Sequence, residues 1–374
     1  MKLSIDKHEF QRGLTRIQTI VEKRNTMPIL ANVLLDAKKD GDAGVLSFAA
    51  TDLEVGICGS HPASVAEAGG ITVSAKKLYE IVRELPEEPV HLEVASNFYL
   101  TLRCARAEFS LAGTAPEEYP DRPMVSPGRM AVVQGAVLGD MIARTMYAAS
   151  IDETRYNLNG VFLERRSDRD TIRMVATDGH RLACVDRELG SDFEGLSSGV
   201  IIPRKALAEI KRLVDEEDTE EVEIGFEGNH GLVRKGSVTL TMRLIEGEFP
   251  NYQQVIPEQT NHHLMVPTET LGHALRRVAL LSAERGRAIK LDLSDGTLAL
   301  SANNPDLGEA REEIDVDYAG ETLSIAFNAR YLMDALAALA TKEARLEFQD
   351  SLSPAQLIPS DDADTLAVVM PMRV

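Results

Sequence analysis

The sequence predicts three tandem α+β domains, each with an antiparallel sheet covered by helices on one face. A strand–turn–strand pattern recurs at Thr51, Thr177 and Asn303, so successive copies lie 126 residues apart (177 minus 51, and 303 minus 177). Each interval holds two amphipathic helical patterns among short strand-like runs, and proline-rich segments separate the intervals. A repeat of this length divides the 374 residues into units of about 125, a common domain size.

The first unit spans residues 1–126 and is expected to contain two helices. The apolar face of the first helix is formed by Phe10, Leu14, Ile17 and Val21. The second helix is expected to begin at Ser74, an N-capping residue type, and to end before Pro86. Four prolines within residues 116–127 exclude a helix or a central strand from this linker. Strands are expected at residues 29–36, 45–50, 53–58, 90–94, 99–104 and 108–112.

The second unit (residues 127–257) and the third (residues 258–374) repeat this order of elements. The first helical face of the second unit carries Leu138, Met141, Ile142 and Thr145. Its later helix opens at Pro203, where a missing N–H is tolerated. The helical faces of the third unit carry Leu271, Leu275, Val278 and Leu281, and then Leu332, Leu336 and Leu339. Further strands are expected at residues 161–164, 171–176, 182–186 and 366–370.

Composition favours a globular protein of a reducing compartment. Apolar residues make up 44% of the chain, and no apolar run is long enough for a membrane span. The three cysteines, Cys58, Cys104 and Cys184, lack Cys-x-x-Cys spacing, so we expect free thiols and a cytoplasmic location. The net charge of −19 argues against coating nucleic acid by overall charge. Nevertheless, the predicted helices carry basic residues off their apolar faces, whereas acidic residues gather in loops.

Asp178 and His180 are the strongest catalytic candidates, and a DNA-processing hydrolase centred on them is the alternative function. Such a site would also need a nucleophile and an orienting group. The first copy of the turn has Leu53 and Glu54 after its own Thr-Asp, so the turn recurs there without the histidine. We therefore expect a structural turn used three times and no catalytic residue. A second alternative is a protein-only scaffold whose basic helices are incidental.

No sequence motif indicates a metal or a cofactor. Gly-x-Ser-x-Gly, His-Glu-x-x-His and zinc-ligand spacings do not occur. Residues 231–237 come nearest to a phosphate-binding loop, but they lack the lysine after the second glycine and lie in an expected strand hairpin. We expect no cofactor and no metal site.

Four segments together carry a specific family pattern: residues 176–182, 202–205, 247–252 and 369–374. With them the chain resembles, from Met1 to Val374, the bacterial sliding clamp family, the beta subunit of DNA polymerase III. The resemblance implies a non-enzymatic processivity factor of DNA replication. Three DNA-clamp domains per subunit would close into a ring as a head-to-tail homodimer, with helices lining a central hole and antiparallel sheets outside.

The resemblance also implies three sets of site residues. A peptide-binding groove would use Leu158, Thr177, Gly179, His180, Arg181, Leu182, Pro250, Gln254, Val255, Val368, Val369, Met370, Pro371, Met372 and Arg373. DNA would be faced by Arg12, Arg24, Lys76, Lys77, Arg83, Tyr156, Arg204 and Lys205. The dimer contact would join Arg106, Phe109 and Leu111 to Leu280, Leu281, Glu309 and Glu312.

The implied partners are double-stranded DNA, bound without sequence preference, a second copy of the chain, and proteins that compete for the groove. These proteins are the alpha subunit of DNA polymerase III, the clamp loader complex, and other replication and repair proteins with a clamp-binding motif. Several positions, near the groove and at the interface, depart from the usual pattern of the family. They are Gln254, Gly286, Pro354, Glu108 and Arg311.

Overall fold

The computed structural model describes residues 1–21, 27–40, 43–121, 125–126, 129–166, 169, 171–188, 196, 199–216, 221–282 and 287–373. The chain forms two compact units. Unit 1 contains residues 1–136 and 208–244, and unit 2 contains residues 137–190, 196–207 and 245–374. The division passes through the predicted second domain because part of its strands joins the sheet of the first segment, while the others pair with strands near the C-terminus.

Unit 1 is built on a sheet of thirteen strands, in which every described strand pair is antiparallel. The pairing of Val238–Arg243 with Val55–Pro62 joins the first and second predicted domains in this sheet. In sheet order the strands are β10 (Met130–Gln134), β15 (Glu221–Glu227), β16 (His230–Lys235), β17 (Val238–Arg243), β4 (Val55–Pro62), β3 (Ala43–Thr51), β2 (Asn32–Asp40), β6 (Gly69–Ser74), β9 (Ala107–Thr114), β8 (Tyr99–Cys104), β7 (Val90–Val94), β1 (Lys2–Ile5) and β5 (Ser64–Glu67).

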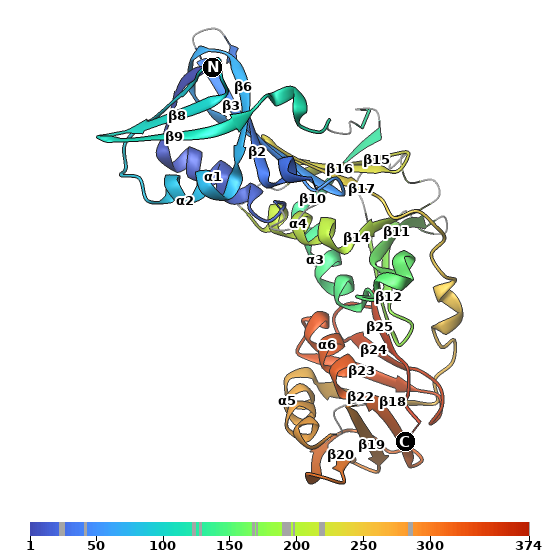
Figure 1. Ribbon diagram of the computed structural model, residues 1–374. Helices are drawn as coiled ribbons and strands as arrows, with labels where there is room; N and C mark the ends of the chain where they lie inside the picture. The colour runs from blue at the N-terminus through green and yellow to red at the C-terminus, as the bar shows by residue number, and fades with distance from the viewer. Residues whose placement is uncertain are drawn as a thin grey trace. The chain divides into compact units, whose positions relative to one another are not determined.

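Two helices, α1 (Lys7–Ile17) and α2 (Ala75–Arg83), lie side by side against one face of this sheet (Figure 1). The Asp6 carboxylate caps α1 by accepting from the backbone N–H groups of His8 and Glu9, and the Ser74 hydroxyl caps α2. The predicted apolar faces are confirmed at Phe10, Leu14 and Leu78, which are fully buried. An antiparallel sheet with helices on one face is therefore correct for this unit.

Several predicted boundaries in unit 1 are wrong. Helix α1 ends at Ile17 and does not reach Val21, because the Gln18 side chain donates to the carbonyl oxygens of Leu14 and Ala75 and the chain then turns. The expected strand over residues 29–36 begins as a short 3-10 helix, Pro28–Ala31, before β2. Strands β5 and β6 were not expected. Their glycines and polar residues hide the alternation that indicates a strand.

Unit 2 contains a sheet of eight strands and a sheet of four, again with antiparallel pairing throughout the described strands. The eight are β14 (Val200–Pro203), β11 (Gly160–Arg166), β12 (Thr171–Thr177), β13 (Arg181–Glu188), β25 (Thr365–Val369), β24 (Ala355–Pro359), β23 (Glu343–Phe348) and β18 (His262–Pro267). The four are β21 (Gly308–Asp315), β20 (Thr297–Asn304), β19 (Ala288–Ser294) and β22 (Leu323–Asn328).

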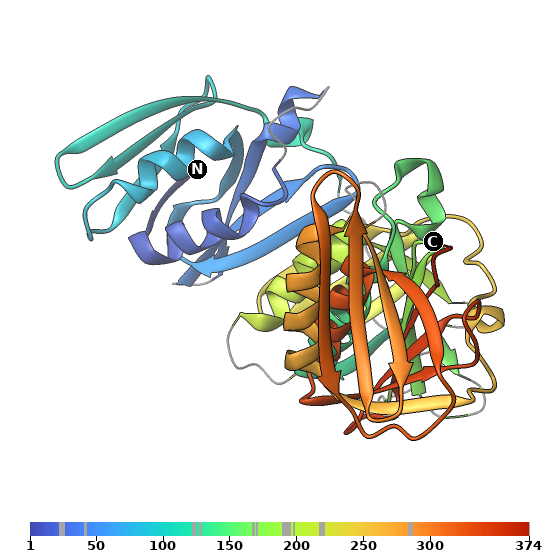
Figure 2. The same ribbon diagram turned by 90° about the horizontal axis from the view of Figure 1, so that it is seen from below.

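Helices α5 (Thr268–Val278) and α6 (Ala329–Leu339) lie side by side in unit 2, and α5 packs against β20 and β21 (Figure 2). Their predicted apolar faces are buried, except that Leu281 falls in a 3-10 turn, Ala279–Leu281, after α5 has ended. The remaining helices are α3 (Gly135–Thr145) and α4 (Arg204–Asp215). Pro203 is the last residue of β14, so α4 begins one residue later than predicted. Within the described parts of the chain, no helix combines the length and apolar character needed to cross a membrane.

Candidate functional site

The turn at residues 177–181 joins β12 to β13 and is held by its own side chains. The Thr177 hydroxyl accepts from Gly179 N at 3.1 Å and donates to Arg181 O at 2.7 Å. The Asp178 carboxylate accepts from the backbone N–H groups of His180 and Arg181 at 2.9 and 3.1 Å. Gly179 takes a φ of 88°, a left-handed conformation that glycine adopts without strain.

The same turn stands 126 residues earlier, between β3 and β4. Thr51 and Asp52 make the equivalent four hydrogen bonds, with Leu53, Glu54 and Val55 as partners. Leu53 replaces the glycine with a φ of 78° and has no place in a strand, contrary to the prediction for residues 53–58. The reuse of one turn is thus confirmed for two copies.

The third copy keeps the hairpin and changes the turn. Between β20 and β21, the side chain of Asn304 accepts from Asp306 N at 3.0 Å, and Gly308 takes the positive φ. The expectation of one turn used three times is therefore wrong in its third member. Asn303 and Asn304 provide no equivalent of the Thr-Asp pair.

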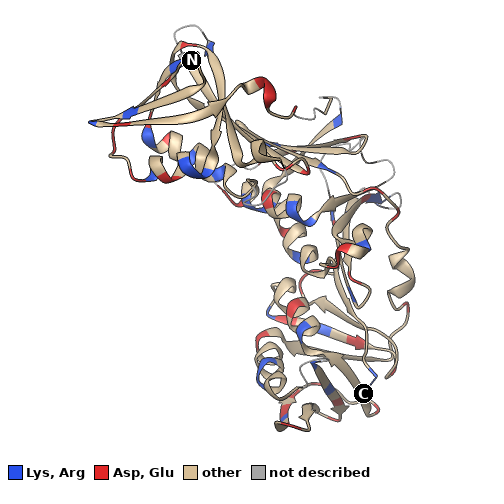
Figure 3. Ribbon diagram, in the orientation of Figure 1, with Lys and Arg blue, Asp and Glu red and all other residues tan. Residues whose placement is uncertain are grey.

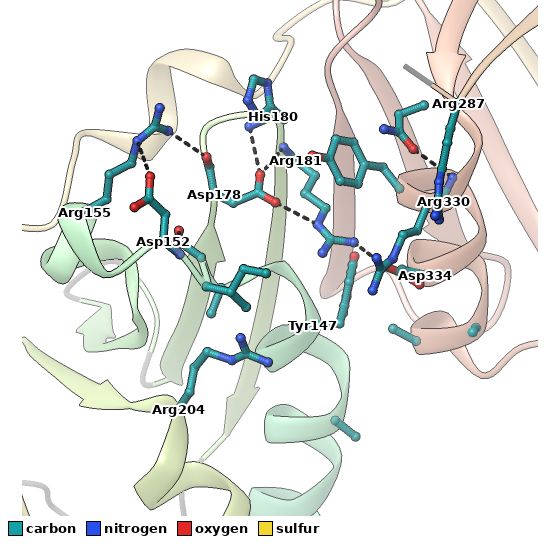
Figure 4. A pocket seen from close by; sticks show the side chains of 18 residues that line it. Tyr147, Asp152, Arg155, Asp178, His180, Arg181, Arg204, Arg287, Arg330 and Asp334 are labelled. Atoms are coloured by element: carbon teal, nitrogen blue, oxygen red, sulfur yellow. Dashed lines mark hydrogen bonds and ion pairs between the residues drawn. The ribbon is translucent and has the colours of Figure 1, made fainter. Parts of the chain in front are cut away.

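Asp178 and His180 do not form a catalytic dyad. The carboxylate of Asp178 binds the main chain of the turn and, through its second oxygen, Arg181 Nε at 3.1 Å (Figure 4). The imidazole of His180 is stacked on the ring of Tyr331, with centroids 6.2 Å apart. Asp178 therefore shapes the turn and does not orient the imidazole, and the hydrolase alternative has no support.

On one face of β13 and β25, an apolar cluster forms around Tyr252. Leu182 lies opposite Val368 across the two strands, and both belong to this cluster, whereas Val369 points to the opposite face and is buried in the main core of unit 2. We call it the Tyr252 cluster; its buried members are Val175, Leu182, Cys184, Tyr252 and Val368, with Phe162, Phe249, Ile256 and Leu366 packed against them.

Aromatic rings attach residues 249–256 to the sheet at this cluster. The rings of Phe162 and Phe249 stack at 5.1 Å, and Phe249 meets Tyr252 edge-on at 6.4 Å. The Tyr252 hydroxyl donates to Glu164 and accepts from Arg173. Arg173 in turn binds the buried Asp186 through two nitrogens, at 2.5 and 2.6 Å. Burial, followed by the hydrogen bond to Glu164, raises the pKa of Tyr252 to about 12.

The residues predicted for the peptide groove are only partly gathered at this cluster. Leu182 and Val368 belong to it, while Gln254 and Val255 are exposed on the adjoining 3-10 helix, Tyr252–Val255. Pro250 and Gly179 are also exposed, Leu158 is half-buried and Thr177 is buried. Sequence reasoning missed Phe162, Val175, Phe249 and Tyr252 as members, although Phe249 and Tyr252 stood within the family segment 247–252.

The C-terminal segment continues past β25 along the same turn. Met370 N donates to His180 O at 2.9 Å, and Met372 N donates to Ala326 O at 2.7 Å, at the edge of the four-stranded sheet. Met370, Pro371 and Met372 are half-buried and Arg373 is exposed. The two thioethers therefore stand beside the turn at the surface, where flexible methionine side chains can adapt to a ligand.

The predicted DNA-facing residues lie mostly on helices (Figure 3). Arg12 lies on α1, Lys76, Lys77 and Arg83 on α2, Arg204 and Lys205 on α4, and Tyr156 in the 3-10 helix Glu153–Leu158. Many of them are paired on their own helix. Lys77 lies 2.7 Å from Glu80, and Arg83 lies 3.1 Å from Glu84. Arg24 lies outside the described residues, as does Gly286.

The predicted dimer residues lie on two strands and their flanks. Phe109 and Leu111 are half-buried on β9, after the exposed Arg106. Glu309 and Glu312 lie on β21, and Glu312 binds Arg277 of α5. Leu280 is 75% exposed beside the half-buried Leu281. Of the positions that depart from the family pattern, Glu108 pairs with Arg103, and Arg311 pairs with Glu313.

The lysine of the phosphate-loop-like segment has a structural role. Lys235 is buried on β16, and its ammonium donates to the carbonyl oxygens of Leu213 and Val214 at the end of α4. A cation there also interacts favourably with the helix dipole. Among the described residues, no three His, Cys, Asp or Glu side chains come together as metal ligands. The cysteines are free; Cys104 and Cys184 are buried, and Cys58 is half-buried.

Comparison with known proteins covers the whole chain. Family models of the DNA polymerase III beta subunit match residues 1–123 (N-terminal domain), 132–251 (central domain) and 253–373 (C-terminal domain). The beta sliding clamp of Caulobacter vibrioides is 37% identical over 384 residues, covering 100% of both chains.

Solved structures agree. A sliding clamp (DNA polymerase III subunit beta) of Bartonella birtlesii, bound to griselimycin, gives a TM-score of 0.94 at 37% identity, with 100% of both chains covered. The sliding clamp of Pseudomonas aeruginosa, also bound to griselimycin, gives 0.93 at 36% identity and the same coverage. The chain has the three-domain clamp fold, and it belongs to the DNA polymerase III beta subunit family, the beta sliding clamps.

Proposed function

We propose that two copies of the chain close head to tail into a ring around duplex DNA and tether the replicative polymerase to it. Membership of the family makes the chain a non-catalytic DNA clamp. The ring, its partners and its contact residues are the proposal. Three domains per subunit, with boundaries near residues 126 and 257, would give the ring six domains, with helices lining the hole and sheets outside.

Open strand edges are the observation that carries ring closure. From Ala107 to Ala112, β9 pairs only with β8 among the described residues. β21 is the last strand of its sheet and pairs only with β20 there. An unpaired edge is a template for another strand. Joining β9 of one copy to β21 of the next uses two different surfaces, and such a heterologous contact closes into a ring when the rotation permits.

Apolar and charged side chains beside the two edges support the same contact. Phe109 and Leu111 flank the first edge, and the exposed Leu280 and Leu307 lie near the second. Burying a leucine of this kind contributes about 1.5–3 kcal/mol. Glu309 and Glu312 give the second edge an acidic character, which Arg106 of the other copy can complement.

Sliding requires weak phosphate contacts, and the helix charges support this. Lys76, Lys77 and Arg83 are exposed, but each has an acidic partner. Lys76 and Lys77 pair with the carboxylate of Glu80, and Arg83 pairs with that of Glu84. Each basic group therefore attracts phosphate less than a free cation would, and salt screens what remains. Closure of the ring would hold DNA topologically, so high affinity is unnecessary and the net charge of −19 is no obstacle.

The peptide site is proposed at the Tyr252 cluster and the C-terminal segment. A ligand crossing this surface would meet Val255, Met370 and Met372, with Leu182 and Val368 beneath. Peptides from the DNA polymerase III alpha subunit, the clamp loader complex, and other replication and repair proteins would compete for it. Micromolar affinity corresponds to about −8 kcal/mol, which a few apolar anchors can supply. With these partners, the protein would work in the cytoplasm.

Sedimentation of the full chain at micromolar concentration tests the ring contact. We expect a dimer for the wild type and a monomer for Phe109→Asp or Leu280→Asp, each altering only one of the two edges. Mixing the two variants should not restore a closed ring. One contact of the mixed pair joins two intact edges, but the other joins two altered edges. The matched control, Leu352→Asp, alters a leucine that is 70% exposed elsewhere and should stay dimeric. A monomeric wild type, or dimeric edge variants, would refute the contact.

A further inference from the structure

A cavity of about 820 Å³ lies in unit 2, on the side of the turn that carries Asp178 and Arg181 (Figure 4). Its volume is within the range of about 300–1,000 Å³ that is usual for small-molecule sites. Five arginines line it, Arg155, Arg181, Arg204, Arg287 and Arg330, against the three carboxylates of Asp152, Asp178 and Asp334. The lining is therefore net positive in a chain whose total charge is −19.

Of these arginines, Arg181 is held by contacts within the protein. Arg181 binds Asp178 at 3.1 Å and Asp334 at 2.6 Å, and its guanidinium lies over the rings of Tyr147 and Tyr331. Two of the three carboxylates that line the cavity, those of Asp178 and Asp334, are therefore paired with Arg181. Arg181 therefore forms part of the wall and has little capacity for a ligand.

The other arginines retain capacity for an anion. Among the described residues, the half-buried Arg204 has no carboxylate within ion-pair distance, and neither has Arg287. Arg330 reaches Asp334 only at 3.7 Å. Arg155 lies 3.8 Å from Asp152 and also donates to the Asp178 carbonyl oxygen at 3.2 Å, so it is partly engaged. Figure 4 shows Arg204 entering from the side of the central segment, while Arg287 and Arg330 enter from the C-terminal segment.

Two long helices begin at this cavity. Arg204 is the first residue of α4, and Asn328, Arg330 and Tyr331 surround the start of α6. The amino ends of helices carry partial positive charge and favour anions. Guanidinium groups present paired N–H donors that match the oxygens of phosphate. The helix ends and the available arginines thus favour the same chemical group.

We propose that this cavity binds a phosphate group, held by Arg204 from one side and by Arg287 and Arg330 from the other. The group is that of a free nucleotide or of pyrophosphate, and this role goes beyond the DNA-facing role already proposed for Arg204. The site is separate from the Tyr252 cluster, because Arg181 and Leu182 are consecutive in β13 and point to opposite faces. It does not depend on ring closure, since every residue belongs to one chain.

Titration calorimetry with pyrophosphate, ADP and a short linear duplex at low salt tests this proposal on the full-length protein. Arg204→Gln and Arg330→Gln should each weaken binding about tenfold, the loss expected from one charge-assisted hydrogen bond. Arg276→Gln is the matched control. Arg276 is an exposed arginine of α5 outside the cavity, without an ion pair among the described residues, so binding of pyrophosphate should be unchanged.

The three probes separate the sources of the phosphate. If pyrophosphate or ADP binding responds to Arg204→Gln, the ligand is a free phosphate compound. If only duplex binding responds to Arg204→Gln, the result reflects the DNA-facing role already proposed for Arg204 and overturns the cavity site. Binding of pyrophosphate or ADP that weakens in Arg204→Gln and Arg330→Gln but not in Arg276→Gln supports the site. Absence of binding by both pyrophosphate and ADP would also overturn the site, and so would equal weakening of their binding by Arg204→Gln and Arg276→Gln, which would indicate only a loss of overall charge.

Discussion

Met370 N donates a hydrogen bond to His180 O at 2.9 Å, which fixes the C-terminal segment beside the Thr177–Arg181 turn. The two residues are far apart in sequence and meet because β25 lies next to β13. This contact places Met370 beside the start of β13, the strand that carries Leu182 of the Tyr252 cluster. It is the structural basis on which we propose the peptide site at this surface.

Deletion of Met370–Val374 should abolish binding of a clamp-binding peptide from the polymerase while leaving the dimer intact. The deletion removes both thioethers and the Met370–His180 hydrogen bond, whereas β9, β21 and the buried Val368 and Val369 are retained. Fluorescence anisotropy with a labelled peptide and size-exclusion chromatography measure the two outcomes. Unchanged peptide affinity in a folded, dimeric deletion variant would contradict this assignment.

Tyr252→Phe should lower the free energy of unfolding by about 1–3 kcal/mol at neutral pH, because Glu164 loses a buried donor. The penalty should shrink at alkaline pH. The pKa of Tyr252 is raised to about 12, against about 10 in the unfolded chain, so its stabilising effect is present below pH 10 and is lost between pH 10 and 12.

Urea unfolding of the wild type and Tyr252→Phe at pH 8 and near pH 11 measures this change. Tyr156→Phe is the control, since that ring is 60% exposed, and its difference from the wild type should be small at both pH values. A difference between the wild type and Tyr252→Phe that is the same at both pH values would show that the Tyr252 hydroxyl is not held as described.

Arg181→Gln should destabilise unit 2 by about 2–4 kcal/mol, because it leaves the carboxylates of Asp178 and Asp334 without their shared cation. This loss is somewhat smaller than the roughly 3–5 kcal/mol for breaking a fully buried pair, since Asp334 is 34% exposed. Arg330→Gln removes a weaker partner of Asp334 from a side chain that is 63% exposed and should cost below about 0.5 kcal/mol. Comparable unfolding midpoints for the two variants would contradict the role of Arg181.

Helical periodicity was the most reliable guide to the fold. The spacing of Phe10 and Leu14, or of Leu332 and Leu336, correctly identifies helices, because the four-residue spacing of apolar residues is visible in the local sequence. The strand predicted over residues 53–58 was wrong at Leu53, which lies in a turn with a left-handed backbone. The local sequence does not distinguish an apolar residue in such a turn from one in a strand. The repeat at Asn303 was seen correctly as a hairpin, but its turn chemistry differs from that of Thr51 and Thr177.

The candidate sites were less accessible to sequence reasoning. The Tyr252 cluster joins Phe162, Leu182, Tyr252 and Val368, and the arginine cavity joins side chains from Tyr147 to Ala338. Such groupings depend on tertiary pairing, which no local pattern encodes. The groove, DNA-facing and dimer residues came from the family resemblance instead, and those roles stay predictions.

Retention on DNA tests the central claim most directly. The protein should be loaded by a clamp loader onto a nicked circular duplex, washed in high salt, and measured before and after the circle is cut once. A closed ring held topologically predicts stable retention on the circle and rapid loss after linearisation, because salt screens the weak phosphate contacts but cannot open the ring. Equal retention on circular and linear DNA would contradict the claim.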